Sequence, residues 1–239
     1  MKSVLALVIL CLLGCDKMPH LVWSNDKKNE KIQINKPQLN DSINGVIFTL
    51  DDGVSLVNTP KVLDILKHNN LQAIFFVEGV NLAGNSEQAI ERRELLKRTT
   101  IEGHIIGNHS YSHHLFTTMS LQKVEWEINT TTKLIEDTTG QKVSLIRLPY
   151  GKSNGAINAL LKKKQLTPVY WTYDLREYEL DPMTHSHKTK EQLLATFIEQ
   201  YNKYHIEQGI KKTILLLHDT KNITPDVLPL IINYLNTNK

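Results

Sequence analysis

The stretch Val46-Ile47-Phe48-Thr49-Leu50-Asp51-Asp52-Gly53 is a short apolar run that ends in two adjacent carboxylates and a glycine. Its first five residues are mostly β-branched, aromatic or aliphatic, which is typical of a strand that is buried on both faces. Such strands belong to parallel sheets that helices cover on the outside. The stretch therefore predicts an α/β fold in which Asp51 and Asp52 lie at a strand end.

The rest of the chain repeats this unit, because short apolar runs alternate with longer amphipathic stretches. Strands are predicted at Val46–Leu50, Ala73–Val77, His104–Gly107, Ser144–Leu148, Pro168–Tyr173 and Thr213–Leu217. Helices are predicted at about 60–69, 87–101, 120–138, 153–164, 189–208 and 224–237. With no internal repeat and no second boundary, residues 45–239 are interpreted as one domain. Periodicity alone does not decide between a closed barrel and an open sheet.

Composition and charge exclude several classes of protein. The chain has 239 residues, 41% of them hydrophobic and 22% charged, as in soluble globular domains. The 28 Lys and Arg exceed the 25 Asp and Glu by three, and the excess forms no basic stripe. No nucleic-acid partner is therefore predicted, and nothing implies an obligate protein partner.

The first residues, MKSVLALVILCLLGC, predict a leader. About ten apolar residues follow Lys2, which suits a signal peptide and is short of the roughly 20 that span a bilayer. The ending Leu12-Leu13-Gly14-Cys15 resembles the lipobox of bacterial lipoproteins. We therefore expect a signal peptide at 1–14, a lipid-modified Cys15 with a polar tether at 15–44, and a membrane-anchored protein of the bacterial cell envelope. Asp16 suggests retention at the inner membrane, and a secreted protein with an incidental Cys15 is the alternative.

Residues suited to chemistry follow most of the predicted strands. They are Asp51 and Asp52, His109 and His113, Arg147 with Pro149 and Tyr150, Asp174, and His218. The carboxyl ends of parallel strands share one edge of the sheet, where α/β proteins build their active sites. The pattern predicts that these side chains gather in one site.

The spacing of His109 and His113 allows both imidazoles to face one point, and Asp52 is the natural third ligand. Two histidines and one carboxylate leave open positions on a metal ion, which is typical of a catalytic site. Taken alone, the histidines are weak evidence and are also explained as a surface or capping pair, and Asp51-Asp52-Gly53 as a turn. His104 is interpreted as a hydrogen-bonded interior histidine.

Together these residues resemble the motifs of the polysaccharide deacetylase family, the family-four carbohydrate esterases with the NodB homology domain. The matching segments occur in the family's order: Phe48–Gly53, His109–His113, Arg147–Tyr150, Asp174–Tyr178 and Leu215–His218. The resemblance covers about residues 45–238. It implies a distorted, incomplete (β/α) barrel of about seven strands.

The resemblance also implies an activity, the metal-dependent hydrolysis of N-acetyl groups on polymers of N-acetylglucosamine. Asp52, His109 and His113 would hold the metal, expected to be Zn²⁺, with Co²⁺, Ni²⁺ or Mn²⁺ as alternatives. Asp51 would be the general base that takes a proton from the attacking water. His218 would be the general acid that protonates the leaving amine.

The remaining roles follow from the same resemblance. Asp174 would pair with His218 and keep it protonated, and Arg147 would line the groove and tune the carboxylates. Tyr150 would offer its backbone N–H to the oxyanion, and its ring would contact substrate together with Pro149, Tyr178 and Trp171. Filling the core is an equal alternative for Trp171.

The sequence departs from the family pattern at Leu50 and Val54, which should leave the metal ligands intact, and at Glu177 and Tyr178, where the groove wall and with it the choice of substrate differ from the family's. Peptidoglycan, chitin-like oligomers and poly-N-acetylglucosamine all remain candidates. Two alternative functions remain open: an esterase or non-sugar amidase with the same metal site, acting on acetylated xylan or a cyclic amide, and a catalytically silent glycan-binding lipoprotein.

Overall fold

The computed structural model describes residues 43–238. The predicted leader, Cys15 and nearly all of the predicted tether lie outside these residues. The predicted tether includes Ile43 and Asn44, but both residues contact the domain. Ile43 packs against the hydrophobic core, and the Asn44 amide donates hydrogen bonds to the backbone oxygens of Leu235 and Asn238.

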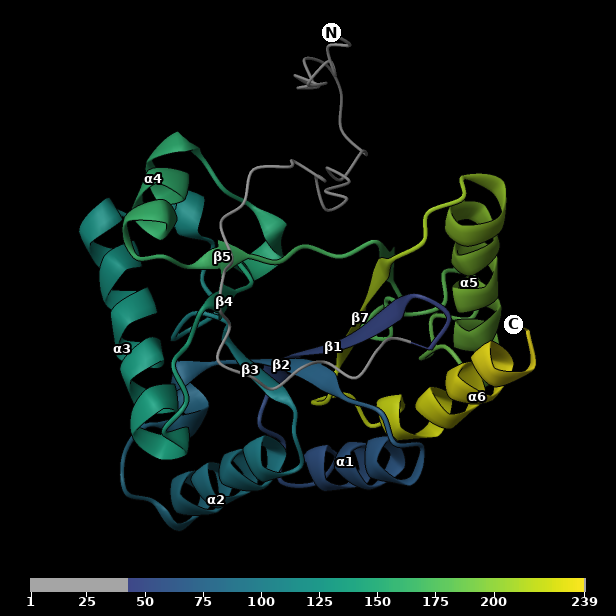
Figure 1. Ribbon diagram of the computed structural model, residues 1–239, viewed down its shortest axis with the longest axis horizontal. Helices are drawn as coiled ribbons and strands as arrows, with labels where there is room; N and C mark the ends of the chain where they lie inside the picture. Colours follow the sequence, from purple (N-terminus) through teal and green to yellow (C-terminus); the bar gives the residue numbers. More distant parts are fainter. Residues whose placement is uncertain (1–42, 239) are drawn as a thin grey trace, which may run out of the picture.

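A single curled sheet of parallel strands forms the centre of the described part of the chain (Figure 1). Its strands are β1 (Val46–Gly53), β2 (Ala73–Val77), β3 (Ile105–Asn108), β4 (Leu145–Ile146), β5 (Thr167–Pro168), β6 (Tyr173–Asp174) and β7 (Thr213–His218). Their order is β5-β4-β3-β2-β1-β7-β6. The edge strands β5 and β6 do not pair, so the structure is an incomplete barrel, as predicted.

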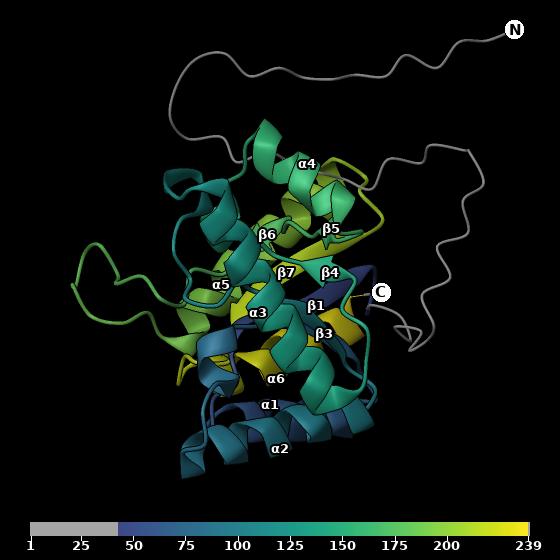
Figure 2. The ribbon, with the colours of Figure 1, turned by 90° about the vertical axis from the view of Figure 1, so that its left-hand side faces the viewer.

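Helices cover the outside of this half-barrel in the same order as the strands, α4-α3-α2-α1-α6-α5 (Figures 1 and 2). They are α1 (Thr59–His68), α2 (Glu87–Ile101), α3 (Leu121–Thr139), α4 (Gly155–Lys163), α5 (Lys190–Tyr201) and α6 (Thr224–Thr237). Short turns complete the set: η1 (Gly79–Leu82), η2 (Phe116–Thr118), η3 (Pro149–Gly151) and the π-turn η4 (Asn202–Glu207), which continues α5. Among residues 43–238, no helix has both the length and the apolar character needed to cross a membrane.

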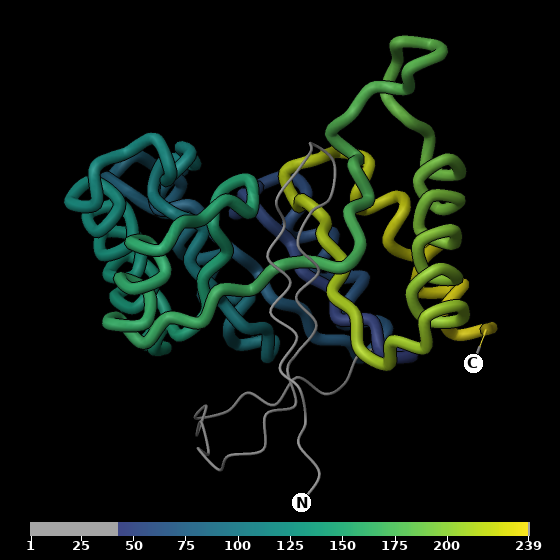
Figure 3. Tube along the Cα trace, turned by 90° about the horizontal axis from the view of Figure 1, so that it is seen from above, coloured from purple at the N-terminus to yellow at the C-terminus, as the bar shows by residue number. Residues whose placement is uncertain are grey.

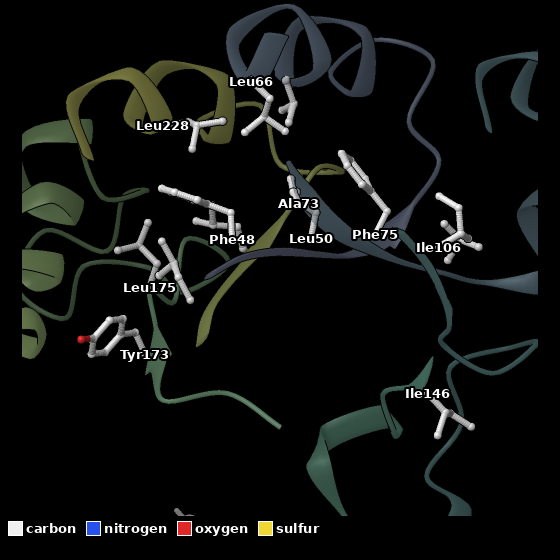
Figure 4. Close-up of a cluster of buried hydrophobic side chains, with 14 of the residues drawn as sticks. Phe48, Leu50, Leu66, Ala73, Phe75, Ile106, Ile146, Tyr173, Leu175 and Leu228 are labelled. Carbon is white, nitrogen blue, oxygen red and sulfur yellow. The ribbon is translucent and has the colours of Figure 1, made fainter. Parts of the chain in front are cut away.

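The core lies between the sheet and these helices. Phe48, Leu50 and Phe75 point to the side of Leu66 on α1 and Leu228 on α6 (Figure 4). Successive strand residues face opposite sides, so Thr49 and Asp51 face the concave side. The outward residues thus anchor the helices, and the inward residues of β1 are free for the site.

The predicted strand Pro168–Tyr173 is wrong, because the structure divides it. β5 pairs with β4 at one edge, and β6 pairs with β7 at the other. The residues between them cross the opening of the barrel, and buried Arg147 donates to the backbone oxygens of Val169 (3.1 Å) and Tyr170 (3.5 Å). The apolar side chains of this segment are partly buried at the opening. The segment therefore has the composition of a strand although it does not pair continuously with one.

The segment between β6 and α5 projects from the rest of the domain (Figure 3). Its two arms join at an isolated antiparallel bridge between Leu180 and His187. His185 and His187 are exposed there, as expected for a solvated loop.

Candidate active site

Asp51 and Asp52 end β1 and both line one cavity of about 500 Å³. Neighbouring residues in a regular strand would point to opposite faces. Here the register with β2 shifts between Leu50 and Gly53, and Asp52 has a φ of +67°. This local irregularity places both carboxylates on the same side of the sheet.

The three predicted metal ligands come together. Asp52 Oδ1 lies 3.4 Å from His109 Nε2 and 3.6 Å from His113 Nε2. The ring nitrogens and the carboxylate oxygen all lie within 4.8 Å of one another. His109 Nδ1 donates to the backbone oxygen of Arg147 over 2.8 Å, so its Nε2 carries the lone pair that faces the cavity.

These donors fit a metal ion. Neighbouring ligands of a tetrahedral zinc ion, with bonds of roughly 2.0–2.1 Å, lie about 3.4 Å apart, close to the observed separations. Asp52 Oδ1 is also buried and, among the described residues, accepts no hydrogen bond. A buried carboxylate oxygen without a donor is costly, and a cation held jointly with the two imidazoles would satisfy it.

The loop that carries the two histidines depends on a buried carboxylate from another element. Glu127 on α3 accepts the backbone N–H groups of Tyr111 and Ser112, both over 2.9 Å, and the Ser112 hydroxyl over 2.7 Å. Ser110 and His113 both have positive φ, which is unusual for residues other than glycine. The Glu127 contacts therefore hold a strained loop, not a helical turn, in the conformation that aims His113 at Asp52.

Asp51 has a different partner. Its Oδ1 accepts from Arg147 Nη1 over 2.8 Å, and the same nitrogen donates to Thr49 Oγ1. Arg147 is fully buried and is not among the residues that line the cavity, so the prediction that it lines the groove is wrong: its guanidinium, just after β4, reaches inward to Asp51. The prediction that it tunes a carboxylate fits this contact with Asp51.

His218 ends β7 directly beside Asp51, its register partner. Its Nδ1 donates to Glu177 Oε1 over 2.9 Å, and its backbone N–H donates to the same oxygen. Burial opposes protonation of the imidazole, but the hydrogen bond to Glu177 and its charge outweigh burial and raise the pKa of His218 to about 9. His218 is thus held as a cation at neutral pH.

The predicted pairing of Asp174 with His218 is therefore wrong. Asp174 instead accepts from the Tyr178 hydroxyl over 3.0 Å and from the backbone N–H of Arg176. Glu177 has one methylene more than aspartate, and the turn after β6 brings it beneath His218. Sequence spacing places both acids near the imidazole, so only the path of this turn distinguishes them.

Aromatic side chains line the cavity. Tyr150, Trp171 and Tyr178 all contribute, and Tyr150 and Tyr178 are 57% and 43% exposed. Half-buried Trp171 lines the cavity instead of filling the core. Pro149 is buried and is not among the lining residues, so its predicted contact with substrate has no support here.

Two further acids lie behind Asp52. Burial and then the Asp52 charge raise the pKa of Glu78 to about 7. Burial also raises the pKa of Asp219 to about 7, although a hydrogen bond from the Thr59 hydroxyl opposes the rise. An added Cβ at Gly53 would lie 2.8 Å from the Asp219 carboxylate oxygens, so a glycine is required between the site and this buried acid.

Comparison with known proteins agrees with this geometry. The family model described as polysaccharide deacetylase matches residues 39–169, more than half of the chain. The chain belongs to the polysaccharide deacetylase family. The matched range includes Asp51, Asp52, His109, His113 and Arg147.

Curated relatives place this deacetylase-family chain among enzymes named for cell-wall polymers. It is 31% identical over 209 residues to peptidoglycan-N-acetylmuramic acid deacetylase PdaC of Bacillus subtilis, covering 87% of this chain and 39% of the relative. It is 35% identical over 134 residues to peptidoglycan-N-acetylglucosamine deacetylase PgdA of Listeria monocytogenes, covering 56% and 27%. The chain thus spans only part of the length of these relatives.

Solved structures show the same fold. The Bacillus subtilis PdaC structure superposes with a TM-score of 0.65 at 26% identity, covering 82% of this chain and 86% of that one. A pseudoenzyme of the same esterase family from Bacillus anthracis superposes at 0.67 with 22% identity, covering 84% and 62%. Because an inactive relative shares the fold, the fold alone does not establish activity.

Sequence reasoning missed three acids of the site. Glu127 holds the loop of the two histidines, Glu177 accepts from His218, and Glu78 lies close enough to Asp52 for that charge to raise its pKa. Glu177 was visible as the fourth residue of its motif. Glu127 lies on α3, and Glu78 directly follows β2. Nothing in the sequence around either residue distinguishes it from a surface glutamate.

Proposed function

We propose that the protein is a metal-dependent hydrolase that removes N-acetyl groups from N-acetylglucosamine-containing polysaccharide and releases acetate. The observation that carries the proposal is the division of roles between adjacent aspartates. Asp52 faces both His109 and His113, whereas Asp51, whose Oδ2 also lies 3.5 Å from His109 Nε2, is held by buried Arg147. A site of this kind keeps one carboxylate as ligand and the next as base. Family membership supports the same reaction.

The chain's own residues supply the proton transfers. Hydrolysis adds water across the amide, so that the C–N bond breaks and acetate and a free amine form. Asp51 accepts the proton of the attacking water, and protonated His218 delivers a proton to the leaving nitrogen. The backbone N–H of Tyr150 stabilises the oxyanion. A divalent ion such as Zn²⁺, held by Asp52, His109 and His113, would act as a Lewis acid on the carbonyl and lower the pKa of water.

The surroundings suit a polymer. The aromatic rings of Tyr150, Trp171 and Tyr178 offer apolar surfaces for sugar rings around a cavity of about 500 Å³. Peptidoglycan, chitin-like oligomers and poly-N-acetylglucosamine are the candidate polymers. Relatives named peptidoglycan deacetylases and chitin deacetylase support the first two.

We also propose that the protein acts in the bacterial cell envelope, anchored through lipid-modified Cys15. The support is the leader and its lipobox-like ending. Metabolic labelling with an alkyne fatty acid, compared between the wild type and Cys15→Ala, tests this. Equal labelling of both would exclude the anchor at Cys15.

To test the activity, the full-length protein is incubated with peptidoglycan, with chitin-like oligomers or with β-1,6-linked N-acetylglucosamine oligomers. The acetate released from each substrate is then measured. Release is expected to stop after chelation and to return with zinc. Asp51→Asn should lower kcat by about 10²–10⁴-fold and leave the bound metal unchanged, whereas Asp52→Asn should lose the metal.

Asp137→Asn, at an exposed ion pair with Lys133 on α3, is the matched control and should retain activity. Acetylated xylan separates an esterase from an amidase. Metal-loaded protein that releases no acetate from any amide-linked polymer would exclude the proposed reaction.

A further inference from the structure

The catalytic cavity opens into a flanking cavity on each side. One, of about 580 Å³, shares His113, Tyr150 and Lys152 with it. The other, of about 410 Å³, shares Tyr178 and Lys221 with it. The three cavities form one groove with the site at its centre, so a chain of sugars would extend to both sides of the reacting unit.

Each junction includes one tyrosine and one lysine. Tyr150 and Lys152 come from the turn after β4, whereas Tyr178 and Lys221 come from the turns after β6 and β7. An exposed aromatic ring gives a sugar an apolar face to pack on. An ammonium beside each ring gives the same sugar a positive charge, so the two junctions present the same pair of chemical groups.

The two lysines carry charge that the site itself does not neutralise. The inner carboxylates have partners: Asp51 pairs with Arg147, Glu177 with His218, and Asp52 with the two histidines. Asp174 accepts the Tyr178 hydroxyl. By contrast, no ion pair joins Lys152 or Lys221 to a carboxylate of residues 43–238, although nearby Lys188 pairs with Glu179.

One exposed carboxylate, Asp226, also lines the flank beside Lys221. It lies in the first turn of α6, where the positive end of the helix dipole offsets part of its charge. Asp226 lines only the flanking cavity, whereas Lys221 lines both this cavity and the catalytic one, so the ammonium is the charge that the two cavities share.

We propose that Lys152 and Lys221 select a glycan that carries carboxylate groups on the sugars on both sides of the reacting N-acetylglucosamine. Such a strand alternates neutral and acidic sugars, and one carboxylate would reach each lysine while the sugar rings pack on Tyr150 and Tyr178. A uniform neutral polymer would leave both ammonium groups without a partner. The inference rests on the proposed function, because it places the reacting sugar in the central cavity.

The experiment compares two tetrasaccharides of equal length by calorimetric binding to the full-length, zinc-loaded protein. One alternates N-acetylglucosamine with N-acetylmuramic acid, which carries a lactyl carboxylate, and the other is neutral chitotetraose. The proteins are the wild type, Lys152→Gln, Lys221→Gln, the double variant and Lys163→Gln. Lys163 is an exposed lysine on α4 that lines none of the three cavities.

The wild type should bind the acidic tetrasaccharide about tenfold more tightly than the neutral one, since two solvent-accessible ammonium–carboxylate pairs add a modest affinity, and tenfold corresponds to about 1.4 kcal/mol in total. Each single variant should lose part of this ratio, the double variant should bring it close to one, and Lys163→Gln should retain it. The wild-type ratio should also shrink as NaCl rises from about 50 to about 500 mM, since salt screens such pairs.

Equal affinities in the wild type, or a ratio that the double variant keeps, would overturn the inference. Acetate release from both oligomers without discrimination would overturn it while leaving the deacetylase proposal intact. Charge-dependent binding without acetate release from either oligomer would support the lysine assignment and contradict the deacetylase proposal.

Discussion

At the scale of single residues, the partners of the catalytic groups decide their protonation. His218 is a cation because one buried glutamate, Glu177, accepts from both its ring and its backbone N–H. Asp51 beside it accepts a hydrogen bond from the buried Arg147 guanidinium over 2.8 Å. The proposed acid and the proposed base thus lie in one cavity, and each contacts a different buried partner.

Replacing Glu177 by Gln should shift the pH profile of the reaction. A general acid works only while protonated, so the alkaline limb of kcat/KM should fall near pH 9 in the wild type, where the pKa of His218 lies. Without the Glu177 charge the limb should move toward the ordinary histidine pKa of about 6.5. Steady-state rates from pH 5 to about 10 measure both limbs, and Glu179→Gln, in an exposed ion pair, is the control. An unchanged limb would contradict the role of Glu177.

His104 should make stability depend on pH. It is buried, its Nδ1 accepts the Ala73 N–H, and burial lowers its pKa from 6.5 to about 4. The unfolded chain therefore binds more protons in this interval, so stability falls as pH drops from 6.5 to 4, by about 3 kcal/mol in total.

Urea unfolding at several pH values measures this loss. His104→Gln should be less stable at pH 7 but should lose less stability on acidification, whereas His68→Gln, on the last turn of α1, should behave as the wild type. An acid dependence that survives His104→Gln would assign the effect to other groups.

At the scale of elements, α3 positions the metal ligands without contributing one. Its buried Glu127 holds the loop from β3 through two backbone N–H groups and a hydroxyl. The loop contains residues of positive φ, which relax when their supports are removed. The geometry of His113 is therefore set by a helix that follows it in the sequence.

Glu127→Ala should weaken zinc binding by about 10–100-fold, as the loss of an outer partner of a ligand commonly does. Competition with a chromogenic chelator measures the affinity. Glu125→Ala on the same helix, where an exposed carboxylate pairs with Lys164, should bind zinc as the wild type does. Equal zinc affinities of Glu127→Ala and Glu125→Ala would show that the loop keeps its conformation without Glu127.

At the scale of the whole molecule, Arg147 joins the two halves of the open barrel. It contacts Asp51 and Thr49 on β1 and the backbone oxygens of the segment that crosses the opening. Its side chain also stacks on Phe76, 4.4 Å from the ring centroid. Hydrogen bonds from this one guanidinium thus link β1 to the segment that crosses the opening, where β5 and β6 do not pair.

Arg147→Met should destabilise the fold by about 3–5 kcal/mol, because it leaves a buried carboxylate without its partner. Urea unfolding measures the change. Asp51→Asn combined with Arg147→Met should recover part of the loss, since the unpaired charge is then gone. A double variant as unstable as Arg147→Met would show that the contacts across the opening dominate.

Much of this molecule follows from its sequence alone. The alternation of apolar runs and amphipathic stretches determines the parallel α/β class, and the residues after each run determine which side chains meet at the carboxyl edge. Both are local properties, because strand direction and side-chain alternation are set within a few residues. The gathering of Asp52, His109 and His113 could therefore be predicted.

Other features were decided only by the tertiary structure. The run Pro168–Tyr173 divides between two sheet edges, Arg147 turns beneath the groove, and Glu177 in place of Asp174 reaches His218. Each of these features depends on which distant strand or turn packs against the residue in question. The amino-acid composition would be the same with a different neighbour, so it does not predict the contact. Buried polar groups take the partner that the folded chain brings within hydrogen-bonding distance, and that distance exists only once the half-barrel has curled.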